Sequence, residues 1–198
     1  MSDNLIFKIC GGYFDTVDDP VIGNNVSGGV AIPGLLGKKF TVDTAQVKYK
    51  TNVVYGGKFQ YVKFYASSTL TAVVGHIAFW QDPTNSVVTA DLPTLPGQIA
   101  GIFLGSVTKG NYTLIQTGGL VYICNRASAF TKTTSAIGDT MIAYAGGVMD
   151  NVAEATGWTP PYQRAYLGQA YDRPVVSTNI LTTMSLTRVY LTGATPSL

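Results

Sequence analysis

The segment GIFLGSVTKGNYTLIQTGGLVYI, residues 101–123, alternates apolar and polar side chains over most of its length. Alternation with a period of two indicates β-strands. We expect one strand over 99–107, a turn at Lys109-Gly110-Asn111 and a second strand that begins at Tyr112. A glycine pair, Gly118–Gly119, interrupts the second strand, and glycine inside a strand marks a bulge or a close backbone approach. We therefore predict that this strand bends sharply at the glycine pair and then continues.

Alternation of the same kind occurs upstream. In KFQYVKFY, residues 58–65, aromatic and β-branched side chains fill both faces, as strands prefer. The stretch 40–55 alternates too, and it ends at Gly56–Gly57, a pair that accepts the dihedral angles of a tight turn. We therefore predict a hairpin of 40–55 with 58–67, closed by this glycine pair.

Turn residues punctuate the rest of the chain about every 8–12 residues, a spacing typical of barrels and sandwiches. One short helix is expected over 150–157, where Asn151 could cap the first turn. The other segments that we expect to be extended are 70–80, 87–90, 140–144 and 185–191, with a turn at 82–86. We predict an all-β fold, a compact β-barrel or sandwich of short antiparallel strands with long loops and an extra N-terminal β-rich segment or arm.

Two domain divisions are compatible with this pattern. The first has an N-terminal arm and β-hairpin segment over 1–69 and a second β domain over 70–198. The second is one continuous domain.

Charged residues are only 12% of the 198 residues, against about 25% in an average soluble protein. A protein fixed in an assembly needs little charge for solubility, but a weakly charged free β-protein is an equal alternative. The net charge is +2 without a basic cluster, so we expect no nucleic-acid partner. The longest apolar run, 70–80, is too short and too interrupted for a membrane span, and we expect no membrane partner.

Residues that could perform chemistry are scarce. His76 is the single histidine, and the chain contains no G-x-S-x-G or G-x-x-x-x-G-K motif. The acidic cluster at 15–19 is expected to be a solvated turn, with a calcium loop as the alternative. Cys10 and Cys124 are expected to be buried thiols, with a disulfide as the alternative. We predict no catalytic residue, metal or cofactor, and no enzymatic activity.

Aromatic side chains are more suggestive, because Tyr and Trp combine a large contact area with a polar group. Trp158 and Tyr162 lie in the Pro-rich loop WTPPY, and Trp80 ends an apolar segment beside a turn. We predict these three residues as candidate partner contacts, and ordinary core or turn positions are the alternative.

Four segments together resemble the head decoration (cement) proteins of tailed bacteriophages. They are VVGHIAFWQDPTNSVVTAD, GQIAGIFLGSVTKGNYTLIQTGGLVYI, IGDTMIA and YLGQA, and the most specific piece combines Tyr112 with Ile115-Gln116-Thr117-Gly118-Gly119. The resemblance covers roughly residues 70–192, whereas 1–69 departs from the pattern of the family. It implies a structural virion protein on the outer capsid surface, assembled in the host cytoplasm. The implied partners are the major capsid protein, whose subunits it bridges, and further copies of itself as a dimer or trimer.

Two other functions stay open. The chain could be a carbohydrate-binding or host-adhesion module, such as a head fibre or tail-associated domain, with Trp158 and Tyr162 as a stacking platform. It could also be another virion component, such as a minor capsid or tail-tube subunit. If the resemblance holds, residues 1–20 are our candidate for contact with the capsid or a neighbouring copy.

Overall fold

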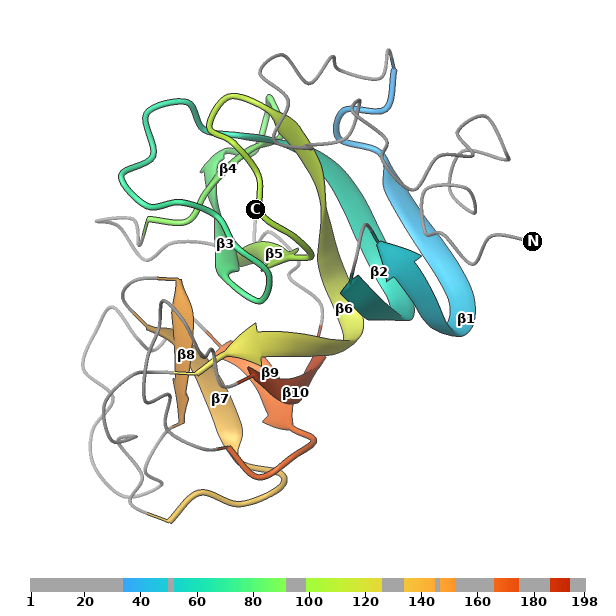
Figure 1. The fold of residues 1–198 in the computed structure, drawn as a ribbon, viewed down its shortest axis with the longest axis vertical. Coiled ribbons are helices and arrows are strands. Elements are labelled where there is room, and N and C mark those ends of the chain that lie inside the picture. The colour runs from blue at the N-terminus through green and yellow to red at the C-terminus, as the bar shows by residue number, and fades with distance from the viewer. Residues whose placement is uncertain are drawn as a thin grey trace.

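The computed structural model describes residues 34–49, 52–91, 99–125, 134–144, 147–151, 166–174 and 186–192. These residues form strands and turns without a helix, which confirms the predicted all-β class (Figure 1). The strands are β1 (Lys39–Tyr49), β2 (Asn52–Phe64), β3 (Ile77–Asp82), β4 (Val87–Thr89), β5 (Ile99–Phe103), β6 (Tyr112–Cys124), β7 (Thr140–Tyr144), β8 (Val148–Asn151), β9 (Tyr166–Ala170) and β10 (Leu186–Leu191). No helix that could cross a membrane occurs in these ranges.

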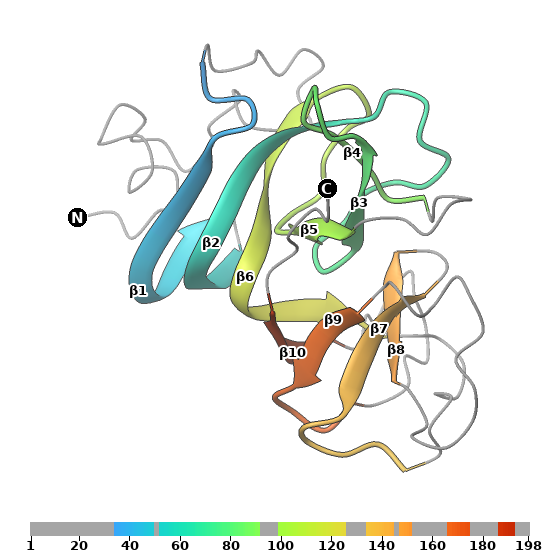
Figure 2. The same cartoon turned by 180° about the vertical axis from the view of Figure 1, so that it is seen from behind.

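Strands β2 to β6 close into a small barrel. β2 pairs in parallel with β4, and antiparallel pairings then connect β4 to β3, β3 to β5 and β5 to β6. Antiparallel pairing of β6 with β2 completes the ring. β1 lies beside β2 outside the ring, and Figure 2 shows β1, β2 and β6 as three long curved strands side by side.

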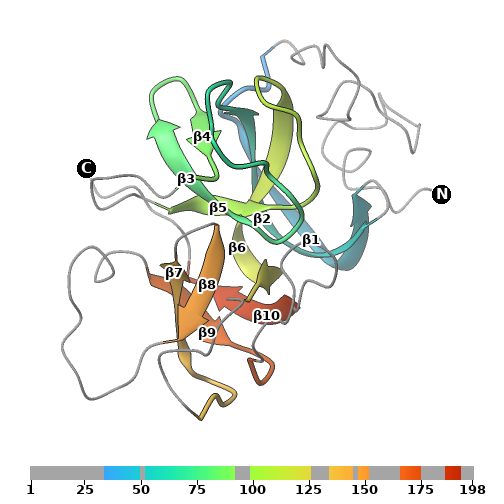
Figure 3. The ribbon, with the colours of Figure 1, turned by 60° about the vertical axis from the view of Figure 1, so that its left-hand side comes forward.

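A second group of strands extends from the barrel. The last part of β6, from Gly119 to Cys124, pairs with β10, and β9, β7 and β8 follow in that order. In Figure 3 these strands lie below the barrel. All ten strands belong to one continuous sheet, and we call the part of it formed by the end of β6 with β10, β9, β7 and β8 the second sheet. A single strand, β6, therefore belongs both to the barrel and to the second sheet.

The change of partner in β6 occurs at the glycine pair. Gly118 and Gly119 are opposite Lys58 and Gly57 of β2, and the register shifts immediately beyond them, as a bulge requires. Gly119 has a φ of +94°, and a Cβ at this position would lie 3.1 Å from the carbonyl oxygen of Gly56. The bend predicted at Gly118–Gly119 is thus confirmed.

Gln116 stabilises the bend of β6 at Gly118–Gly119, which we call the corner. Its side chain is fully buried, and Nε2 donates hydrogen bonds to the carbonyl oxygens of Gly118 at 3.3 Å and Leu120 at 2.9 Å. A bulge leaves backbone groups without ladder partners, so a buried amide donor stabilises the bend.

The hairpin turn predicted at Gly56–Gly57 is wrong. β2 runs through this pair without a break, and the hairpin partner of Asn52 is Tyr49, so residues 50 and 51 connect the strands. The glycines serve a different purpose, because a Cβ on Gly57 would overlap the carbonyl oxygen of Gly118. Glycine at this position permits the close approach of β2 to β6.

The structure confirms some of the other predicted segments and corrects the rest. β4, β7 and β10 confirm the extended segments expected near 87–90, 140–144 and 185–191, and the predicted turn at 82–86 is present. Of the segment 70–80, only the part from Ile77 onward forms a strand. Of the helix expected over 150–157, Asp150 and Asn151 instead pair with β7 as part of β8, and residues 152–157 lie outside the described residues.

From Phe59 to Val62 both faces of β2 are buried, which explains why the alternation there lacks a polar face. Phe59 and Tyr61 belong to the larger hydrophobic cluster, whereas Val62 and Phe64 belong to the smaller one. The larger cluster also contains residues of the second sheet, among them Met141, Met149, Leu167 and Val189. Continuous apolar packing therefore joins the barrel to the second sheet.

Candidate functional site

Of the three predicted contact residues, the described part of the chain contains only Trp80; Trp158 and Tyr162 lie outside it. Trp80 is in β3, where its ring packs at the edge of the smaller hydrophobic cluster. The buried indole Nε1 makes no hydrogen bond to the described residues. The role of these three residues as partner contacts stays a prediction.

His76 and Cys124 are buried side chains near the junction of the barrel with the second sheet. Burial lowers the pKa of His76, a shift that the Thr71 backbone partly opposes. Burial raises the pKa of the Cys124 thiol to about 12, and its Sγ donates to the carbonyl oxygen of Val74 at 3.3 Å. Cys10, the other predicted thiol, lies outside the described residues. Within those residues, no three of the His, Cys, Asp and Glu side chains gather as a metal site requires.

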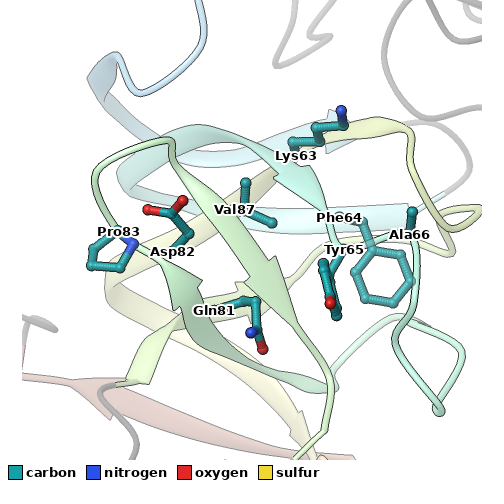
Figure 4. A pocket seen from close by; sticks show the side chains of 8 residues that line it. All are labelled: Lys63, Phe64, Tyr65, Ala66, Gln81, Asp82, Pro83 and Val87. Carbon is teal, nitrogen blue, oxygen red and sulfur yellow. The ribbon is translucent and has the colours of Figure 1, made fainter.

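An open depression of about 570 Å³ lies between the end of β2 and the β3–β4 turn (Figure 4). Its lining includes Lys63 and Asp82, which lie on opposite sides of it. The Asp82 carboxylate accepts hydrogen bonds from the backbone and side chain of Asn85 at 3.1 and 2.7 Å, and these bonds lower its pKa. The Lys63 ammonium lies 5.7 Å from the ring centroid of Tyr112. The Lys63 and Asp82 side chains are thus each engaged with a neighbouring residue, and the depression does not bring their charges together around a ligand position.

A more organised group of side chains lies on the second sheet. In β10, Thr187 and Val189 are buried, so the alternating residues Arg188 and Tyr190 point to the other face. Tyr190 is 53% exposed and is opposite Gln169 of β9, while Arg188 is opposite Tyr122 of β6. We call this surface the tyrosine face, and it comprises Tyr55, Tyr122, Gln169, Tyr171, Asp172, Arg188 and Tyr190.

Arg188 is the centre of the tyrosine face. Its Nε and Nη2 donate to the two carboxylate oxygens of Asp172 at 2.7 and 2.6 Å, in the bidentate geometry that suits a guanidinium. Its Nη1 donates to the hydroxyl of Tyr55 at 3.1 Å. The hydrogen bonds from Arg188 lower the pKa of Asp172, so the carboxylate stays ionised and its charge offsets that of the guanidinium.

The tyrosine rings pack around this ion pair. The Arg188 guanidinium carbon lies 4.7 Å from the ring centroid of Tyr171, and the Tyr190 ring meets Tyr171 at 5.8 Å and 61°. On the other side, the hydroxyls of Tyr55 and Tyr122 are 3.2 Å apart, and this hydrogen bond raises the pKa of Tyr122. Such a surface can stack and form hydrogen bonds, because aromatic faces and polar ring tips are presented together.

Sequence reasoning missed the tyrosine face. The alternation in Thr187-Arg-Val-Tyr-Leu191 already places Arg188 and Tyr190 opposite a buried valine, and this signal was available. The hydrogen bond between Arg188 and Tyr55 could not be predicted from the sequence, because it depends on how β2, β6 and β10 are arranged in space. Strand β9 was also missed, since YLGQA is short and contains glycine.

No protein-family profile and no curated protein sequence matches the chain. Among solved structures, the N base of the head fibre gp8.5 of bacteriophage phi29 is similar, with 12% sequence identity and a TM-score of 0.42. The alignment covers 67% of this chain and 93% of that chain. A likeness this distant supports no argument about function.

Proposed function

We propose that this protein is a structural component of a bacteriophage virion that binds the outer surface of the capsid. In this proposal, oligomers of the protein bridge subunits of the major capsid protein and stabilise the shell. The resemblance of residues 70–192 to head decoration proteins supports the proposal. The low charge of the chain fits a protein that spends its functional life within an assembly.

The observation that supports the proposal most strongly is the structural role of its most specific motif. Tyr112 stacks on Tyr61 with ring centroids 5.9 Å apart, Gln116 braces the corner, and Gly118–Gly119 permit the bend. Tyr112, Gln116 and the two glycines of the motif thus help to build the strand that joins the barrel to the second sheet. A motif that specifies a rigid frame is what a scaffold protein requires.

Stabilisation of the shell follows from mass action. A protein that binds assembled capsid and not dissociated subunits shifts the equilibrium toward the assembled state. Many copies, each with a modest interface, would together oppose internal pressure on the shell. We place the capsid contact in residues 1–20, which precede in sequence the strands β2 to β6 that close the barrel.

Co-sedimentation with capsids that lack this protein tests the proposal. The full chain should bind saturably, and a variant lacking residues 1–20 should keep its fold by circular dichroism but lose binding. Saturable binding by the truncated variant would contradict the assignment of the contact to residues 1–20. Absence of binding by the folded full chain would contradict the capsid-binding function itself.

A further inference from the structure

The tyrosine face presents two aromatic rings to solvent at neighbouring positions. Tyr171 and Tyr190 are 46% and 53% exposed, and their ring centroids are 5.8 Å apart, so the two rings form one aromatic patch instead of scattered exposed side chains. We propose that the tyrosine face binds a neutral carbohydrate. This inference goes beyond the proposed capsid attachment and does not depend on it.

The rings are held in place before any ligand arrives. The Tyr171 ring contacts both the Arg188 guanidinium and the Tyr190 ring, and the Tyr171 backbone N–H donates to the carbonyl oxygen of Arg188 at 2.8 Å. Asp172 fixes the guanidinium through both carboxylate oxygens and also accepts from the Arg188 backbone N–H at 3.2 Å. Fixed rings lose little conformational entropy on binding, which favours affinity for a weakly interacting ligand such as a sugar.

The charge of the tyrosine face argues for a neutral ligand. Asp172 offsets Arg188 within a bidentate pair, and the other members of the face are tyrosines and Gln169. An anionic or cationic ligand would gain little from such a surface, and it would lose hydration on binding. Each of the three Arg188 nitrogens also already donates one hydrogen bond, to Asp172 or to Tyr55.

The chemistry of the exposed groups matches a sugar ring. One face of a pyranose presents C–H groups, which pack on the electron-rich face of an aromatic ring, while its hydroxyls need polar partners. The Tyr171 and Tyr190 hydroxyls and the exposed Gln169 amide lie close to the rings and can donate and accept hydrogen bonds. Tyr and Arg are also enriched at protein–protein contacts, so a protein partner is the alternative occupant, and the capsid co-sedimentation described below distinguishes it.

Isothermal titration of the full chain with neutral hexasaccharides tests this inference. The neutral probes are cellohexaose, maltohexaose, xylohexaose and hexa-N-acetylchitohexaose, with polygalacturonate and chitosan oligomers as charged comparisons. At least one neutral probe should bind, and Tyr190→Ala should weaken that binding by about tenfold or more, as the loss of a central aromatic contact does. Tyr190→Phe keeps the ring and should bind within a few-fold of the parent. Leu36→Ala, at an exposed residue that precedes β1, is the control that should bind normally.

Several results would overturn the inference: no binding of any neutral probe, binding of charged probes only, or unchanged binding by Tyr190→Ala. Capsid co-sedimentation separates this inference from the proposed function. Tyr190→Ala should bind capsids normally if its face serves a carbohydrate. Loss of capsid binding by Tyr190→Ala, without sugar binding by the parent, would make the tyrosine face a protein contact and refute the carbohydrate assignment alone.

Discussion

Replacement of Gly119 by alanine tests the corner on which both halves of the fold depend. The φ of +94° at Gly119 is unfavourable for any residue with a Cβ and costs about 1–2 kcal/mol. The new methyl group would also lie 3.1 Å from the Gly56 carbonyl oxygen and 3.3 Å from the Gly57 Cα, where only backbone can move aside. Crowding of this kind costs about 1–3 kcal/mol, so the free energy of unfolding should fall by about 2–5 kcal/mol in total.

Gly138 provides a matched control for the backbone cost. Its φ is +85°, but a Cβ there would meet no atom within 4 Å. Gly138→Ala should therefore lose only the conformational part, about 1–2 kcal/mol. Urea unfolding followed by circular dichroism measures both variants. Equal losses for Gly119→Ala and Gly138→Ala would refute the close approach of β2 and β6 at the corner.

Gln116→Leu should lower the free energy of unfolding by about 1–3 kcal/mol in urea titrations, because buried carbonyl oxygens at the corner lose their donor; an unchanged midpoint would contradict this role. Burial lowers the pKa of His76 from 6.5. As the pH falls, His76 of the unfolded chain therefore binds a proton at a higher pH than His76 of the folded chain does. Stability should therefore decrease from about pH 7.5 to about pH 5.5, and His76→Gln should remove the part of this decrease due to His76; an identical decrease in the variant would show that other groups cause it. In a Cys10→Ser background, Cys124 should resist thiol reagents at about pH 8 until the chain unfolds, and rapid labelling of the folded chain would contradict its burial.

Local signals were sufficient for much of the fold. The period-two alternation located β6, and a glycine pair inside it predicted the bend, because both features are encoded in consecutive residues. The pair Gly56–Gly57 shows what local sequence signals do not determine. A glycine pair after an alternating stretch looks the same whether it forms a turn or permits contact with a distant strand. Only the pairing with Gly118 and Gly119 distinguishes the two cases.

The candidate site was harder to predict than the fold. We predicted Trp158 and Tyr162 as contacts because they are large aromatic residues in a Pro-rich loop. The aromatic residues that form the tyrosine face lie instead on strands and just after β9. The alternation of β10 could have indicated that Tyr190 is exposed. Nothing in the sequence pairs Arg188 with Tyr55, because β2 and β10 become neighbours only through the bend of β6.

The melting temperature of capsids that lack this protein, measured with and without added full chain, tests the central claim most directly. A structural virion protein that bridges capsid subunits should raise this temperature, and the rise should saturate when every site is filled. An unchanged melting temperature at a saturating concentration of folded protein would contradict the account.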